Sequence, residues 1–138
     1  MSWIILALLS AVFAALVAIF GKIGIKEIDV VVATTARAVI MALVLLLTTL
    51  VMGKIKFMGE IQNKALLFIF LSGLAGALSW FFYFLALKRG PATGVAAIDR
   101  TSVVFVFILA FIFLAEKITW KSAIGAGLLT LGAVLMAI

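Results

Sequence analysis

Residues 94–105 read GVAAIDRTSVVF, and this stretch decides how the whole chain is interpreted. An aspartate and an arginine stand side by side, followed by a threonine and a serine, in apolar surroundings. In a loop water would solvate them, whereas at the centre of a membrane helix each charge costs about 2.5–3.5 kcal/mol on insertion scales. Pro91, the only proline, suits the first turn of a helix, so the stretch is predicted to lie inside one.

The composition indicates that this helix and most of the chain lie in lipid. Of the 138 residues, 68% are hydrophobic and 12% are charged, whereas a soluble domain is about half apolar and about a quarter charged. So short a chain cannot bury that much apolar surface in a water-soluble core. The net charge of +6 fits lysines and arginines that flank membrane helices and meet anionic lipid, so we expect no nucleic acid partner.

The chain contains no cysteine and no histidine. Their absence from the sequence excludes disulfides, thiolate zinc sites, imidazole ligands and nucleophile–base pairs built from either residue. The five carboxylates are scattered along the chain. We therefore expect no enzymatic activity, no metal site and no cofactor.

Five apolar stretches predict five membrane-spanning helices. Each is about 18–24 residues long, enough to cross about 30 Å of hydrocarbon at 1.5 Å per residue. Asp29 is placed to cap the second helix. The predicted fold class is an all-α membrane protein that forms a single transmembrane domain, residues 1–138. Its helices are predicted at residues 3–20, 30–52, 65–87, 91–115 and 120–138.

The loop charges give no orientation signal. Five helices put the termini on opposite sides of the membrane. The lysines and arginines of the loops divide almost evenly between the side of the N-terminus (Lys54, Lys56, Lys64, Lys117, Lys121) and the other side (Lys22, Lys26, Lys88, Arg89). The positive-inside rule therefore expresses no preference. We interpret the balance as dual topology, in which oppositely inserted copies pair as an antiparallel homodimer; the alternative is a fixed orientation set by the first helix or by a partner protein.

Three ionised residues fall within the predicted spans: Arg37, Asp99 and Arg100. Arg37 follows Asp29 by eight residues and Asp99 follows Pro91 by eight, so both lie about 12 Å from the same membrane boundary. An Arg37–Asp99 ion pair is therefore expected, and it leaves Arg100 without an obvious partner. Intramembrane ionisable residues usually mark transport pathways; the alternative is a static ion-pair cluster that pins helices together.

Several neighbours complete the predicted site. Trp80 reaches a depth similar to that of Arg37 and is too deep for the interfacial aromatic belt, so we expect it to line a cavity, with Tyr83 one turn away. The charged trio nets +1, which favours a substrate with an anionic group, and Asp99 is the candidate for proton coupling. The predicted substrate-binding residues are Arg37, Trp80, Tyr83, Asp99, Arg100 and Ser102.

Three sequence elements together carry a family resemblance. They are the A-L-x-x-G-P-A segment Ala86–Ala92, the A-E-K-I-T ending Ala115–Thr119, and the glycine-containing helix from Ile124. On these elements nearly the whole chain resembles the EamA domain of the drug/metabolite transporter superfamily. The resemblance implies a secondary transporter, commonly an exporter; most such transporters look like two fused domains, and this chain resembles one unfused half.

One departure from that family concerns the fourth helix. Many members carry a proline where this chain has Ser102-Val103-Val104, so we expect this helix to be less kinked.

These expectations combine into one function. The chain is expected to be a multi-pass protein of a prokaryotic plasma membrane that pairs with itself as an antiparallel homodimer. It would export a small polar metabolite by alternating access. The competing hypothesis is a non-transporting or heteromeric membrane subunit, in which the buried charges act as an assembly clamp.

Overall fold

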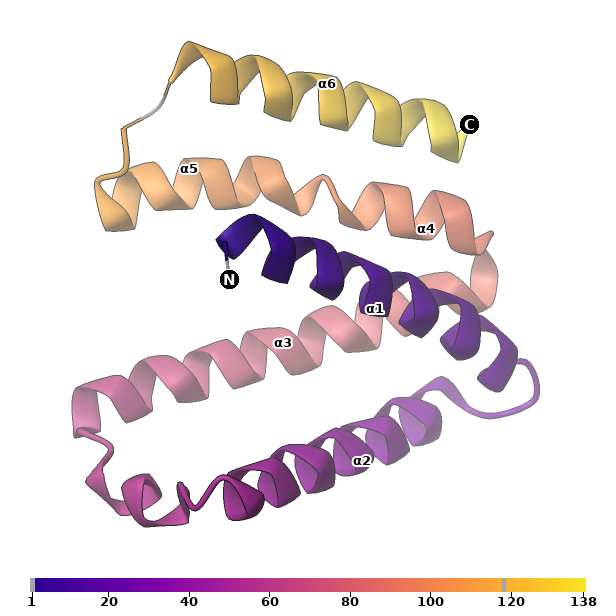
Figure 1. Ribbon diagram of the computed structural model, residues 1–138. Helices are drawn as coiled ribbons and strands as arrows, with labels where there is room; N and C mark the ends of the chain where they lie inside the picture. Colours follow the sequence, from indigo (N-terminus) through magenta and orange to yellow (C-terminus); the bar gives the residue numbers. More distant parts are fainter. Residues whose placement is uncertain (1, 118) are drawn as a thin grey trace. The chain divides into compact units, whose positions relative to one another are not determined.

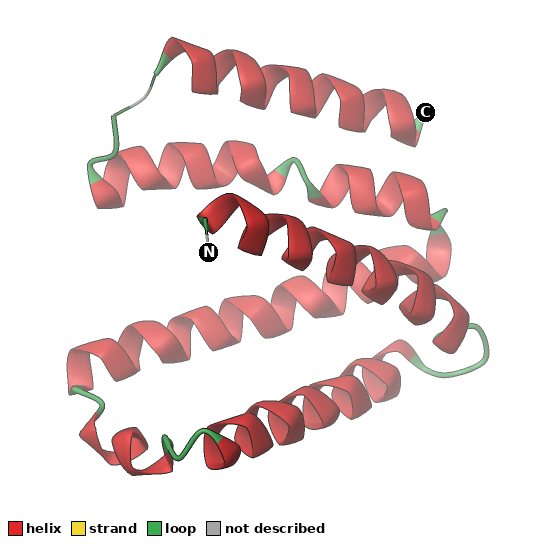
Figure 2. Cartoon of the chain, viewed as in Figure 1, coloured by secondary structure: helices red, strands yellow, loops and turns green. Residues whose placement is uncertain are grey.

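The computed structural model describes residues 2–117 and 119–138, and every regular element within them is helical (Figures 1 and 2). Five helical segments are long and apolar enough to cross a membrane, as predicted, with α4 and α5 together forming the fourth. The elements are α1 (Trp3–Gly24), α2 (Val30–Val51), the 3-10 helix η1 (Ile55–Glu60), α3 (Asn63–Arg89), α4 (Ala92–Asp99), α5 (Ser102–Leu114) and α6 (Trp120–Ala137).

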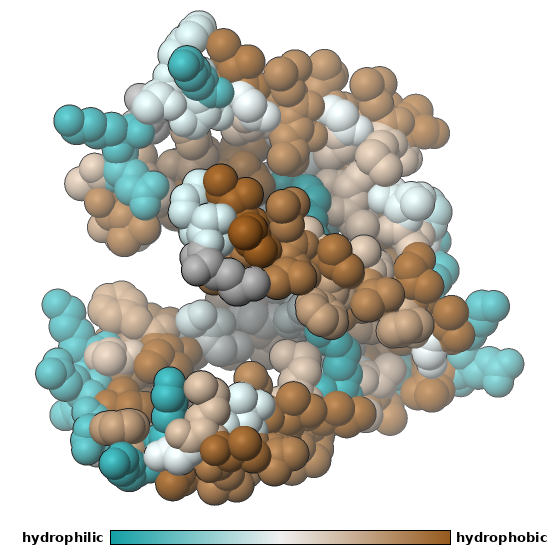
Figure 3. Space-filling view, viewed as in Figure 1, coloured by the Kyte–Doolittle hydropathy of each residue, from teal (hydrophilic) through white to brown (hydrophobic). Residues whose placement is uncertain are grey.

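Most large apolar side chains of the chain are exposed. The buried hydrophobic residues are few and mostly small: Ala18, Ile25, Val30, Phe84, Leu87, Ala97, Ala126 and Ala133. Apolar side chains cover most of the visible surface, and hydrophilic ones gather near helix ends (Figure 3). This is the pattern of helices whose solvent is hydrocarbon, because lipid tails cover apolar side chains at no cost.

The chain divides into two compact units. The first unit, Met1–Ile23 with Arg89–Ile138, contains α1, α4, α5 and α6. Within it α6 packs along α4: a Cβ added at Gly94 of α4 would lie 3.5 Å from the Met136 carbonyl oxygen of α6. The second unit, Gly24–Lys88, contains α2, η1 and α3.

Two lysines at helix ends tie loops to helices. In the first unit, Lys22 Nζ donates a hydrogen bond to the Gly90 carbonyl oxygen at 2.8 Å. In the second unit, Lys88 Nζ donates to the Ile28 carbonyl oxygen at 2.9 Å. Both accepting carbonyls lie outside the helices. Without these lysines they would need water as their hydrogen-bond donor.

The start of α2 confirms the predicted cap. The Asp29 side chain accepts hydrogen bonds from the backbone N–H groups of Val31, at 2.8 Å, and Val32, at 3.3 Å. At the other end of the unit, α3 runs to Arg89, two residues past its predicted end. It stops there because Pro91 disfavours helical geometry at Gly90 and itself lacks an N–H group.

The span predicted over 91–115 lies at Ala92–Leu114, and it is interrupted after Asp99. Helix α4 ends at Asp99 and α5 begins at Ser102, and the green gap between them in Figure 2 marks the break. Around it the backbone bonds are of the i→i−3 type: Arg100 N–H donates to Ala97 O at 3.1 Å, and Thr101 N–H to Ile98 O at 2.9 Å. The Thr101 hydroxyl also donates to Ile98 O, at 2.7 Å.

This break has a local cause. A threonine hydroxyl can bond to the carbonyl of the preceding turn, which competes with the regular backbone ladder. Short 3-10 stretches inside a helix often mark a hinge or strain. The fourth span is therefore irregular even though it lacks the proline that many family members carry. The break falls within the stretch IDRTS, residues 98–102.

Replacing Asp29 by alanine tests the cap of α2. We expect Asp29→Ala to lower the free energy of unfolding by about 1 kcal/mol, because two backbone N–H groups lose their acceptor. Asp29→Asn, which keeps an accepting oxygen, is the control and should stay near wild type. Equal stability of the alanine variant in a denaturant titration of the purified protein would contradict the assignment.

Candidate functional site

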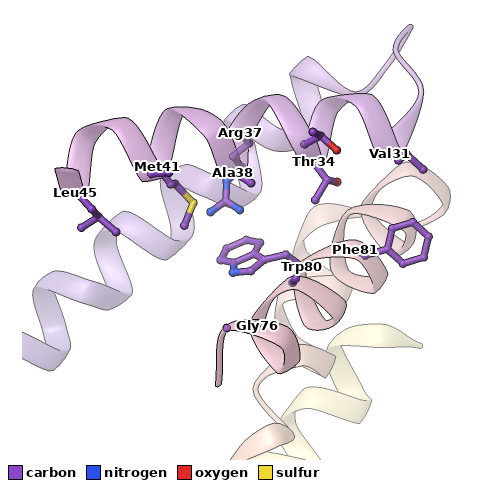
Figure 4. A pocket seen from close by; sticks show the side chains of 13 residues that line it. Val31, Thr34, Arg37, Ala38, Met41, Leu45, Gly76, Trp80 and Phe81 are labelled. Carbon is purple, nitrogen blue, oxygen red and sulfur yellow. The ribbon is translucent and has the colours of Figure 1, made fainter. Parts of the chain in front are cut away.

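The centre of the candidate site is a contact between Arg37 of α2 and Trp80 of α3. The guanidinium carbon of Arg37 lies 3.6 Å from the centroid of the Trp80 ring (Figure 4). It lies 5.3 Å from the ring centroid of Phe84. Both Arg37 and Trp80 are half-buried. This is cation–π geometry, worth about 2 kcal/mol when the pair is desolvated.

An aromatic cluster holds Trp80 in place. The Trp80 ring contacts Tyr83 edge-on, with centroids 5.6 Å apart and planes at 80°, and Phe84 at 5.8 Å. Phe84 is buried. Because residues three and four apart on a helix are neighbours, the sequence of α3 places these rings around the indole. The tryptophan is therefore braced from its own helix while its face is presented to Arg37.

Between α2 and α3 lies a cavity of about 770 Å³. Ligand sites commonly measure about 300–1,000 Å³ and are mostly apolar, with a few polar groups that fix orientation. Among the described residues, the polar groups of the lining come from one arginine, two threonines and the indole N–H of Trp80, and none of these residues is a carboxylate. The lining residues are Val31, Thr34, Thr35, Arg37, Ala38, Met41, Ala42, Leu45, Gly73, Gly76, Ala77, Trp80 and Phe81.

The contact with Trp80 leaves Arg37 with donors for a ligand. A guanidinium carries five N–H donors in a planar fork that matches a carboxylate or phosphate, and one aromatic ring does not engage them all. The Thr34 hydroxyl donates its own proton to the Val30 carbonyl oxygen at 2.7 Å, so its oxygen remains an acceptor only. The cavity thus offers one strong anion-binding group in apolar walls.

The structure brings together three of the six predicted site residues. Arg37, Trp80 and Tyr83 lie in the second unit, the first two on the cavity wall and Tyr83 against Trp80. The expectation that Trp80 lines a cavity is met. Asp99 and Arg100 lie in the first unit, at the α4–α5 break, and both are exposed on the chain.

Ser102, also exposed, begins α5 on the other side of the same break. The expected Arg37–Asp99 ion pair joins residues of different units and stays a prediction.

Sequence reasoning missed part of the cavity wall. Met41 and Leu45 follow Arg37 at intervals of four, and Gly76 precedes Trp80 by four, so each lies on the same helix face as the residue already singled out. That spacing is the signal that could have found them.

A smaller cavity of about 230 Å³ lies in the first unit, at the junction of α5 and α6. Glu116, Lys117 and Ser122 contribute its polar lining. The A-E-K-I-T ending contains these two charges, but Ile118 lies outside the described residues. Thr119 caps α6 by accepting a hydrogen bond from Ser122 N–H at 3.2 Å. The last residue of the A-E-K-I-T segment is thus the N-cap of the last helix.

Single cysteines test whether the larger cavity holds water. The native chain contains no cysteine, so Ala38→Cys would be the sole thiol. We expect a charged, water-soluble thiol reagent to label it at least about tenfold faster than Ala36→Cys, which lies about 160° around α2 from Ala38 at nearly the same depth. Equal labelling rates in liposomes would contradict a hydrated cavity on this face.

The comparisons with known proteins agree with the helical membrane fold. The model of the EamA-like transporter family matches residues 1–138. An uncharacterized transporter in the cobO 3' region of Sinorhizobium sp. is 41% identical over 137 residues, which are 99% of this chain and 97% of that relative. No solved structure matches. The chain is therefore a multi-pass membrane protein that belongs to the EamA-like transporter family.

Proposed function

We propose that this membrane transporter exports a small metabolite with an anionic group by alternating access, as a secondary active transporter. The observation that carries the proposal is the half-buried arginine stacked on Trp80 in the wall of a large cavity. A cation is costly inside a membrane span and is found there mainly where it lines a substrate or ion pathway. Family membership supports transport rather than enzymatic catalysis.

We further propose that the working assembly is an antiparallel homodimer in a prokaryotic plasma membrane. The alignment covers 97% of the Sinorhizobium relative, so that transporter has the length of one such domain, and a transporter of this length would need a second copy to supply the other half. Asp99 and Arg100 are exposed on this chain and fall within a candidate membrane span, so another protein surface or water must shield their charges from the hydrocarbon. A second copy inserted in the opposite orientation would surround Asp99 and Arg100 with protein or with a hydrated cavity. Such a cavity would lie near the membrane midplane, where alternating-access sites are found.

The α4–α5 break supports a role for Asp99 in proton coupling. Asp99 is the last residue of α4 and stands directly before the i→i−3 turn at Arg100 and Thr101. Transporters of this general kind use discontinuous helices near the midplane to hold coupling ions. When a carboxylate at such a break takes up a proton, it loses its negative charge and becomes a hydrogen-bond donor. Protonation of Asp99 would therefore change the interactions at the break between the two helices.

The alternative is a non-transporting subunit. The exposed charges at the α4–α5 break would then clamp this chain to a different membrane protein. Orientation separates the two hypotheses, because a self-sufficient antiparallel pair needs copies of both orientations, whereas a heteromeric subunit needs one.

Reporters fused to the C-terminus measure that orientation. We expect signal from both a cytoplasmic and a periplasmic reporter, because the loop charges are balanced. As a control, three lysines added to the η1 loop should bias the chain to one orientation. Signal from one side only in the unmodified chain would exclude dual topology and favour the heteromeric subunit.

Asp99→Asn tests proton coupling. The variant should bind substrate but lose the acceleration of transport that a pH gradient gives the wild type, because the amide cannot take up a proton. Asp99→Glu is the conservative control and should keep the dependence on the gradient. Transport by Asp99→Asn at the wild-type rate across all pH gradients would refute the role.

A further inference from the structure

We propose that the cavity between α2 and α3 selects amphipathic monoanions, in which one carboxylate is attached to an apolar body, and discriminates against the corresponding amino acids. The inference rests on the proposed transport function and narrows its substrate class. It follows from the distribution of charge and apolar surface in this cavity.

The carboxylate end of the ligand is assigned to Arg37. Its guanidinium carbon lies 3.6 Å from the Trp80 ring centroid, so the indole covers one side of the group, and we assign its remaining N–H donors to a bidentate pair with a carboxylate. In Figure 4 the Arg37 side chain points from α2 into the space between the helices, toward Trp80. A headgroup bound there has an apolar wall beside it.

The apolar body has one direction in which to extend. Met41 and Leu45 continue the Arg37 face along α2, so this wall reaches about 12 Å beyond the arginine. On the facing helix Gly73 and Gly76 provide room, since a Cβ added at either would meet nothing within 4 Å. The ligand's hydrocarbon is thus expected between Met41 and Leu45 of α2 and the two glycines of α3.

The same cavity offers no negative charge to an ammonium group. Among the residues that the structure describes, its lining contains no aspartate or glutamate, and the Thr34 oxygen can accept a hydrogen bond but carries no charge. An amino acid whose carboxylate is bound by Arg37 would hold its ammonium group close to the guanidinium. The two positive charges would then repel each other. A buried unpaired charge is costly, and this cost supplies the discrimination.

Two ligands that differ only in the ammonium group test the proposal: 3-phenylpropanoate and phenylalanine. Binding is measured by Trp80 fluorescence in the Trp3→Phe/Trp120→Phe variant, which keeps one tryptophan of the native three. We expect 3-phenylpropanoate to bind at least about tenfold more tightly than phenylalanine. Propanoate, which lacks the apolar body, and 3-phenylpropanol, which lacks the charge, should each bind at least about tenfold more weakly.

Substitutions at two positions, Arg37 and Gly76, locate the ligand. Arg37→Gln should remove the preference for the acid over the alcohol, and Arg37→Lys should restore part of it. Gly76→Leu should weaken 3-phenylpropanoate at least about tenfold and leave propanoate unchanged, and it improves helix propensity, so loss of folding is not expected. Ala36→Leu, on the far side of α2, is the matched control with unchanged binding.

The outcomes separate the inference from the function on which it rests. Phenylalanine binding as tightly as 3-phenylpropanoate, or no binding by any of the four ligands, overturns the inference. Wild-type affinity in both Arg37→Gln and Gly76→Leu also overturns it, because the ligand would lie elsewhere. Binding with the expected preference but without uptake of labelled 3-phenylpropanoate into liposomes supports the inference and counts against transport.

Discussion

A guanidinium ion inside a membrane span must find a partner, and in this chain the partner within its own unit is the face of an indole. Arg37 lies 3.6 Å from the Trp80 ring centroid. Insertion of an arginine at the centre of a span costs about 2.5–3.5 kcal/mol, and a desolvated cation–π contact returns about 2 kcal/mol. The adjoining cavity would offset the remainder if it holds water, which the labelling of Ala38→Cys tests.

The second unusual feature lies in the first unit, where the fourth span is interrupted between Asp99 and Ser102. The second unit places a cation over an aromatic ring beside a cavity, and the first unit places a carboxylate at an interruption of a helix. In the alternating access that we propose, the cation would bind substrate and the interrupted helix would change shape.

Much of this arrangement was predictable from the sequence, and the failures have physical reasons. Hydropathy and length predicted the five spans because a lipid solvent imposes both, and the cap at Asp29 followed from side-chain chemistry. The break after Asp99 was missed because no glycine or proline marks it, only a threonine hydroxyl that bonds to Ile98. Depth suggested Asp99 as a partner of Arg37, and that ion pair stays a prediction because the two residues belong to different units. The contact of Arg37 with Trp80 was not foreseen, because depth does not specify which way a helix is turned.

The most direct test of this account is a double-mutant cycle on the free energy of unfolding in lipid, with Arg37→Gln, Trp80→Leu and the double variant. If the arginine is stabilised by the indole face, the two substitutions should be coupled by about 1–2 kcal/mol. Trp80→Phe, which keeps an aromatic face, should retain part of the coupling. Additive effects, with a coupling below about 0.3 kcal/mol, would contradict the claim that this contact holds the charge in the membrane.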